Sequence, residues 1–187
     1  LCTKGIYLNN GRLVSSGKIE NVLEEYVKSG DLNTFSYKNQ NIIDSDGTIL
    51  SAEVQNSKHE PIGEISVGEK WRIRIEFQLK KQTKHVIVAA GFSGVMDENL
   101  NTTWSNPHEL SEGRYELIFT NDDLLFAAGT YYVTLGLSTF ERSLNYLPAA
   151  LSFSIVESTK FAYDSRIVRT RGSGLILNQL VESLKKV

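Results

Sequence analysis

Residues 71–79, WRIRIEFQL, alternate strictly between apolar and polar side chains. The apolar set comprises Trp71, Ile73, Ile75, Phe77 and Leu79. The polar set comprises Arg72, Arg74, Glu76 and Gln78. Successive side chains of a β-strand point to opposite faces of its sheet, so this period of two predicts a strand with one buried and one solvated face. Such a strand needs neighbouring strands and a second layer to cover its apolar face.

Five further segments share the short length and the β-branched and aromatic residues that are typical of strands. They are TILSAEVQ at 48–55, HVIVAAGFSG at 85–94, RYELIFT at 114–120, GTYYVTLGLST at 129–139 and ALSFSIVE at 150–157. We therefore predict that residues 48–157 form an all-β domain, an immunoglobulin-like or jelly-roll β-sandwich. The parity predicts that the following residues face inward: Val86, Val88, Ala90, Phe92, Leu117, Phe119, Tyr131, Val133, Leu135, Leu137, Leu151, Phe153 and Ile155.

The segments on either side of this domain have other patterns. Residues 1–30 hold two short apolar runs joined by Asn-Asn-Gly, which suits a tight hairpin, and then an amphipathic helix. Residues 31–47 are polar and rich in Asn and Ser, which predicts a linker. Residues 158–187 predict a strand in SRIVRTR and a helix in GLILNQLVESLKKV, whose apolar face needs a partner. We expect this last segment to contribute to oligomerisation.

The composition excludes several classes of protein. A net charge of −2 over 187 residues gives no electrostatic reason to expect nucleic acid as a partner. No apolar run approaches the roughly 20 residues of a membrane-spanning helix. The single cysteine, Cys2, rules out an internal disulfide framework and fits a reducing compartment. We expect a cytoplasmic protein that binds no nucleic acid.

Residues that often form catalytic or metal sites do not fall into the corresponding patterns here. His59, His85 and His108 have no metal-ligand spacing, so we expect no metal site. Neither a G-x-x-x-x-G-K-[ST] loop nor a G-x-S-x-G motif occurs, so neither nucleotide binding by such a loop nor serine hydrolysis is expected. A carboxylate pair for glycoside hydrolysis stays open, because Asp and Glu are common and no pair stands out.

The first residues resemble the last segment of an ABC-transporter ATPase domain. The matching positions are Cys2, Gly5, Tyr7, Leu8, Gly11, Gly17, Val22 and Tyr26. A polar linker and an all-β domain follow, and this layout resembles the C-terminal half of the ATP-binding subunit of O-antigen exporters of the Wzt type. VGEKWRIRIEF and LLFAAGTYYVTLGLS are similar in cadence to the β-sandwich appended to those subunits. The resemblance extends over residues 1–157.

The resemblance implies that this chain performs no chemistry itself. Residues 1–30 would be the end of an ATPase domain, and the remainder of that domain, outside the printed sequence, would bind ATP and Mg²⁺. The sandwich would be a non-catalytic module that recognises the non-reducing end of lipid-linked O-antigen polysaccharide and couples its capture to export. Its partners would be a transmembrane permease subunit and a second copy of the chain, at the cytoplasmic face of the bacterial inner membrane.

The side chains opposite the core indicate where a glycan would bind. If the strands that contain residues 85–93, 131–138 and 150–156 are neighbours, small residues cover most of their outer face. We expect a shallow trough there, in which a sugar ring approaches the backbone. Its floor would comprise Ala89, Gly91, Ser93, Thr134, Gly136, Ser138, Ser152 and Ser154. Its rim would comprise Tyr132, Trp104, His85 and Arg142, which supply aromatic faces for stacking and polar groups that orient the sugar.

Two other functions stay open at this point. The same small residues would suit a face covered by the C-terminal segment or by a second copy of the chain. The sandwich would then only dimerise the ATPase or dock it to another protein. A third function is an enzyme that trims or caps the glycan. Trp104 would also fit as a satellite-core residue, and Arg142 as an ordinary loop charge.

Overall fold

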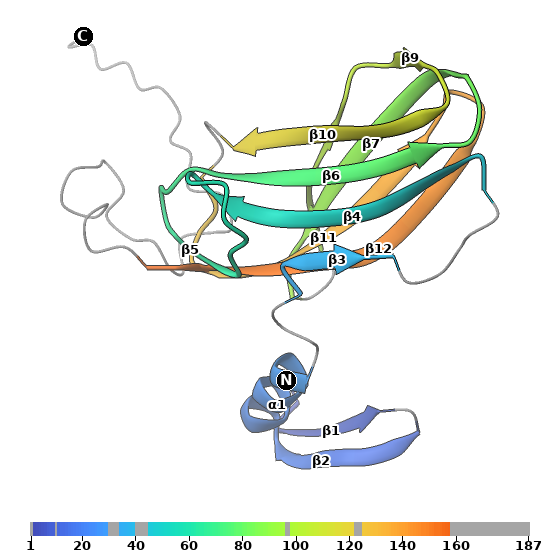
Figure 1. The fold of residues 1–187 in the computed structure, drawn as a ribbon. Helices are drawn as coiled ribbons and strands as arrows, with labels where there is room; N and C mark the ends of the chain where they lie inside the picture. Colours follow the sequence, from blue (N-terminus) through green and yellow to red (C-terminus); the bar gives the residue numbers. More distant parts are fainter. Residues whose placement is uncertain are drawn as a thin grey trace, which may run out of the picture. The chain divides into compact units, whose positions relative to one another are not determined.

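The computed structural model describes residues 2–9, 11–29, 34–39, 45–95, 98–121 and 125–157. The chain divides into two compact units, residues 1–33 and 34–187, and each is considered by itself (Figure 1). The strand and helix expected in residues 158–187 lie outside the described residues. The part of the chain that the structure describes holds no helix long and apolar enough to cross a membrane.

The first unit is a hairpin followed by a helix, as predicted. It consists of β1 (Lys4–Asn9), β2 (Arg12–Lys18) and α1 (Ile19–Ser29). The strands pair antiparallel, and Gly11 has a φ of 77°, the left-handed conformation that primed hairpin turns require. The helix packs closely on β1 because Gly5 has no side chain: a Cβ atom there would lie 2.9 Å from Cδ1 of Ile19.

The first unit leaves much of its apolar surface exposed. Val22 is buried, and the rings of Tyr7 and Tyr26 meet edge to face with their centroids 5.1 Å apart. Ile6 and Leu13, in contrast, are 70% and 62% exposed. A unit of this size buries little apolar area by itself, so these side chains are available to a further surface.

The second unit is a β-sandwich, which confirms the predicted fold class. One layer, here called the β6 sheet, has the order β10-β6-β4-β3. Its strands are β10 (Gly113–Asn121), β6 (Trp71–Leu79), β4 (Gly47–Asn56) and β3 (Ser36–Lys38). The other layer, the β11 sheet, has the order β5-β12-β11-β7-β8, and β9 (His108–Leu110) also pairs with β7. Its strands are β5 (Glu64–Ser66), β12 (Ser143–Val156), β11 (Gly129–Ser138), β7 (Thr83–Ser93) and β8 (Asn99–Trp104).

The core lies between the two sheets, where the alternation predicted it. Alternate residues of β6 and β11 are buried, and the ring of Trp71 packs against Phe92, Phe126 and Phe153 at centroid distances of 5.0–6.0 Å. Leu117 and Phe119 face the core but are only partly buried, because β10 is the edge strand of its sheet. Burial on this scale supplies the main favourable free energy for folding.

Part of the expected linker is a strand. Residues 36–38 form β3, which pairs antiparallel with β4, and Phe35 accepts a hydrogen bond from the backbone N–H of Val54 at 2.8 Å. Phe35 and Tyr37 pack against the core from this segment. Three paired residues are too few to show a period in the sequence. This strand therefore forms because it pairs with β4, and not because of a local sequence pattern.

Candidate functional site

Four residues form a straight row across the outer face of the β11 sheet. Tyr146 of β12 pairs with Gly136 of β11, Gly136 pairs with Ala89 of β7, and Ala89 pairs with Trp104 of β8. We call this set the aromatic row. Its two ends are the large rings, each 65% exposed. Three inter-strand spacings of about 4.8 Å separate the two end residues by about 14 Å.

The middle of the aromatic row is nearly bare backbone. A Cβ atom added to Gly136 would meet only the Cβ of Ala89, at 3.6 Å, so the two strands carry almost no side-chain bulk there. Beside the row, Thr134 of β11 pairs with Gly91 of β7, which pairs with Thr102 of β8. The hydroxyl of Thr134 accepts a hydrogen bond from the backbone N–H of Ala149 at 3.1 Å. This surface offers two aromatic faces, a low floor and nearby hydroxyl groups.

Tyr146 was not among the residues predicted to line this face. The pairing of β11 with β12 shifts between Val133 and Leu135, where residues 148–150 of β12 lie opposite a single residue of β11. The strand predicted from the sequence began at Ala150, and Pro148, which has no backbone N–H, lies just before it. The even-numbered residues of 150–156 point outward, and position 146 has the same parity. Extending this alternation towards the N-terminus would therefore have placed Tyr146 on the outer face.

One end of the face carries a second aromatic pair. The rings of His85 and Phe140 stack at 4.5 Å between centroids with an interplanar angle of 18°, and Phe140 is 65% exposed. His85 has a φ of 54°, at the point where the pairing of β7 with β9 shifts register. Phe140 lies in the turn between β11 and β12, where no parity applies, and the sequence analysis did not identify it.

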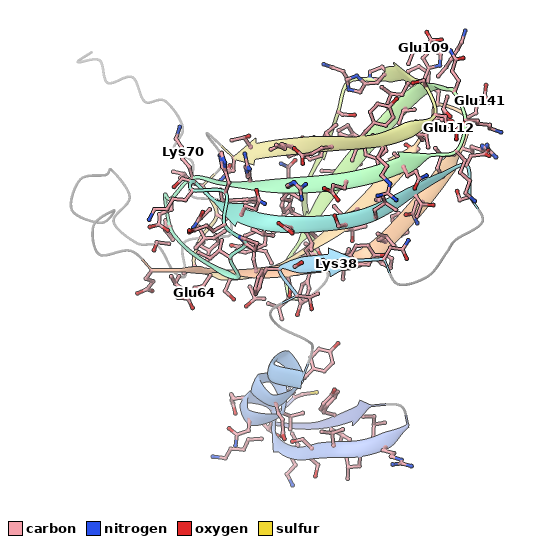
Figure 2. The ribbon with its side chains drawn as sticks, in the orientation of Figure 1. Lys38, Glu64, Lys70, Glu109, Glu112 and Glu141 are labelled. Atoms are coloured by element: carbon pink, nitrogen blue, oxygen red, sulfur yellow. The ribbon has the colours of Figure 1, made fainter. Side chains whose placement is uncertain are left out.

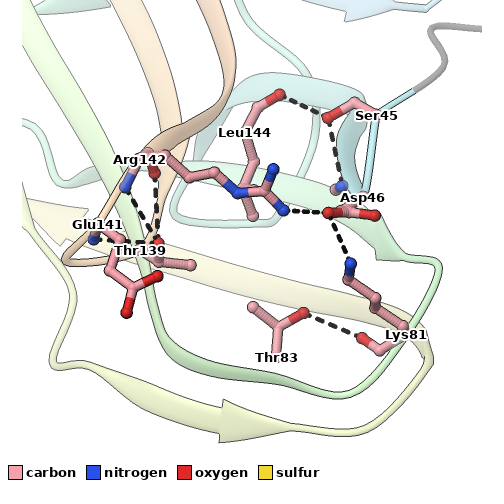
Figure 3. A network of polar contacts seen from close by, with 9 residues as sticks. Ser45, Asp46, Lys81, Thr83, Thr139, Glu141, Arg142 and Leu144 are labelled. Carbon is pink, nitrogen blue, oxygen red and sulfur yellow. Dashed lines mark hydrogen bonds and ion pairs between the residues drawn. The ribbon is translucent and has the colours of Figure 1, made fainter.

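Arg142 lies in the same turn and has a protein partner. Its guanidinium donates to the carboxylate of Asp46, which Lys81 also contacts at 3.0 Å (Figure 3). The hydrogen bond from Lys81, and after it the one from Arg142, lowers the pKa of Asp46 from its ordinary value. The hydroxyl of Ser45 donates to the carbonyl of Leu144 at 2.7 Å beside them. These contacts fasten the residues before β4 to the start of β12.

The opposite end of the face is partly covered by the chain itself. Ser152 is only 2% exposed, its hydroxyl accepts a hydrogen bond from the N–H of Thr34 at 3.1 Å, and its own N–H donates to the carbonyl of Thr34. The prediction that Ser152 lies on the exposed floor of the trough is therefore wrong. Ser154 bonds through its N–H to the carbonyl of Gly63 at 2.8 Å and is partly buried. The segment before β3 covers Ser152 at this end, and the segment before β5 pairs with β12 along the edge of the sheet.

The predicted site residues thus fall into four places. Ala89, Gly91, Thr134, Gly136 and Trp104 lie together around the aromatic row. Ser138 and His85 lie towards the end that carries Phe140. Tyr132 and Ser93 pair with each other on the way to the covered end, where Ser152 and Ser154 lie. Arg142 lies in the turn. Among the described residues, no three His, Cys, Asp or Glu side chains gather as a metal site.

Comparison with known proteins places the sandwich in a family. A model described as the Wzt C-terminal domain matches residues 41–164. Among solved structures, the crystal structure of the C-terminal domain of wzt is similar with a TM-score of 0.60 and 14% identity, over 81% of this chain and 91% of that chain. A β-glucosidase from Listeria innocua in complex with gluconolactone reaches a TM-score of only 0.34, with 12% identity over 56% of this chain and 16% of its own. No curated protein matches significantly.

Proposed function

This chain belongs to the Wzt C-terminal domain family, the carbohydrate-binding domains of O-antigen ABC transporters, and on this premise we propose that its sandwich binds the non-reducing end of lipid-linked O-antigen polysaccharide at the aromatic row. The observation that carries the proposal is that two exposed rings, Trp104 and Tyr146, lie on either side of two residues with little or no side chain, Gly136 and Ala89.

The chemistry of this surface matches that of a sugar. A pyranose presents apolar C–H faces, on which an aromatic ring stacks, and a rim of hydroxyl groups that need hydrogen-bond partners. The rings of Trp104 and Tyr146 supply the stacking surfaces for the C–H faces. The hydroxyl groups of Thr102 and Thr134 beside the row supply hydrogen-bond partners for the sugar hydroxyls. Because Gly136 adds no bulk, a sugar between the rings approaches the backbone. An open face buries little of its ligand, so we expect a dissociation constant in the roughly micromolar to millimolar range.

The domain acts by capture rather than by catalysis. ATP hydrolysis belongs to an ATPase domain of which residues 1–30 are the end, with residues 31–47 as the connection. The exposed Ile6 and Leu13 support this assignment, because they suit a surface that packs against the rest of such a domain. Capture of the glycan end is coupled to export through a permease subunit and a second ATPase subunit, at the cytoplasmic face of the inner membrane.

A titration with glycan tests the proposed function. The 187-residue chain is titrated with O-polysaccharide released by mild acid from cells that encode it, and binding is followed by calorimetry and by NMR. We expect saturable binding, with the largest shifts at Trp104, Gly136 and Ala89. Absence of any response, together with a stable dimer of the chain, would point to the second candidate, a docking or dimerisation domain without glycan contact. The exposed rings favour that candidate as well, since aromatic residues are enriched at protein interfaces.

A further inference from the structure

We infer that this face selects an uncharged glycan end, one without carboxylate, phosphate or sulfate at the sugars that contact the aromatic row. The inference rests on the proposed function and narrows it to a class of ligand. It follows from the distribution of charge over the two sheets, which differs sharply between their outer faces.

The strands under the aromatic row carry almost no charge. Within the described residues, β8, β11 and β12 contain no Asp, Glu, Lys or Arg at all. β7 contains one, Lys84, near its first residue, and the ammonium group of Lys84 faces the carboxylate of Glu109 at 3.7 Å. Figure 2 shows Glu109 at one end of the sandwich, the end at which Glu112 and Glu141 also lie, and away from the middle of the sheets.

The other sheet of the same sandwich carries many charges on its outer face. Arg74 of β6 forms ion pairs with Glu76 and with Glu116 of β10, and Arg72 bonds to Gln55 of β4 at 2.8 Å. Long charged side chains are the ordinary covering of a solvated sheet face. Their absence from β8, β11 and β12, and from β7 except for Lys84, is therefore a property of this face and not of the sandwich as a whole.

Two cationic side chains beside the β11–β12 turn share one carboxylate, and neither belongs to a strand of the aromatic row. Arg142 and Lys81 both contact Asp46, whose lowered pKa keeps it ionised. An anionic sugar on the aromatic row would lose part of its hydration without gaining a cationic partner, and an unpaired charge that is partly desolvated is costly. An uncharged sugar loses less hydration and gains the same stacking on Trp104 and Tyr146. The face thus discriminates against acidic termini.

The test compares three matched forms of one polysaccharide with the 187-residue chain. The first is the O-polysaccharide as isolated from cells that encode the chain. The second has its carboxyl groups reduced to alcohols and its phosphate esters removed. The third has its primary alcohols oxidised to carboxylates. We expect the first two to bind within about twofold of each other, and the third to bind at least about tenfold more weakly.

Two further measurements distinguish an effect of the ligand's charge on affinity from an effect of its shape. The affinity for the isolated form should change by less than about twofold between roughly 50 and 500 mM NaCl, since no ion pair is screened. Ala89→Lys should shift the preference towards the oxidised form, whereas Thr120→Lys, on the exposed face of β10, should leave it unchanged. Loss of binding on removal of the acidic groups, or a steep fall with salt, would overturn the inference while glycan binding itself stood. Failure of all three forms to bind would overturn the proposed function, and the inference with it.

Discussion

Gly136 and Ala89 are direct partners across β11 and β7, and a Cβ atom added to Gly136 would lie 3.6 Å from the Cβ of Ala89, an ordinary van der Waals distance. Gly136→Val should therefore fold normally, with the free energy of unfolding within about 0.5 kcal/mol of wild type. The valine would occupy the floor between the two rings, so glycan affinity should fall at least about tenfold. Calorimetric titration and urea unfolding measure the two quantities.

Thr120→Val is the control for this change, because it places a valine on the exposed face of the other sheet. It should alter neither affinity nor stability. Unchanged glycan affinity in Gly136→Val would mean that the ligand does not lie between Trp104 and Tyr146.

The two rings of the aromatic row should contribute to affinity and not to folding. Each side chain is 65% exposed, so Trp104→Ala and Tyr146→Ala should leave the urea midpoint unchanged. A lost stacking contact of about 0.5–1.5 kcal/mol weakens glycan binding by about 2- to 13-fold. Ile118→Ala, which truncates an exposed apolar side chain of β10, is the control. If Trp104→Ala instead lowers stability by more than about 1 kcal/mol, Trp104 is a satellite-core residue.

The carboxylate of Asp46 should stabilise the fold in a pH-dependent way. Because Lys81 and Arg142 lower its pKa in the folded state, its stabilisation is complete above the ordinary aspartate pKa and disappears as the pH falls through the folded value. Asp46→Asn should therefore unfold at lower urea concentration than wild type at pH 7. The difference should shrink once the pH falls below about 3.9.

A control for this experiment is Glu112→Gln, which removes an exposed carboxylate at the same end of the sandwich (Figure 2). Its urea midpoint should follow that of wild type at every pH. A constant difference between Asp46→Asn and wild type down to acidic pH would contradict the role of ionised Asp46.

The phenol of Tyr131 should make the fold sensitive to alkali. Tyr131 is fully buried, and its hydroxyl donates to the carbonyl of Ala127 at 2.8 Å. Burial, with a smaller effect of Glu98, raises its pKa to about 12. A raised pKa stabilises the fold below the unfolded value near 10, and this contribution is lost at about 1.4 kcal/mol per pH unit as the pH rises towards 12.

Urea unfolding at pH 9, 10 and 11 in wild type and Tyr131→Phe measures this effect, since phenylalanine cannot ionise. The wild type should lose stability more steeply than the variant over this range. Parallel profiles would show that Tyr131 does not carry the alkaline sensitivity.

Much of the sandwich follows from the sequence, because the direction of a side chain in a strand is a local property. The alternation in residues 71–79 and 131–137 predicted which side chains are buried, and those side chains are buried. The hairpin around Gly11 was equally local, since Asn-Gly favours the positive φ that Gly11 adopts. The strand at 36–38 was not predicted, because three residues show no period and β3 depends on β4 to exist.

The candidate site depends both on the sequence of its strands and on the tertiary structure. The sequence by itself determined that small residues face outward from three strands, because parity needs no knowledge of neighbours. Only the tertiary structure decided that Tyr146 pairs with Gly136, that Thr34 covers Ser152, and that Arg142 meets Asp46, 96 residues away along the chain. Those relations arise from strand register and from the closure of long loops. Many registers satisfy the same alternation, and the packing of the whole sandwich selects one of them.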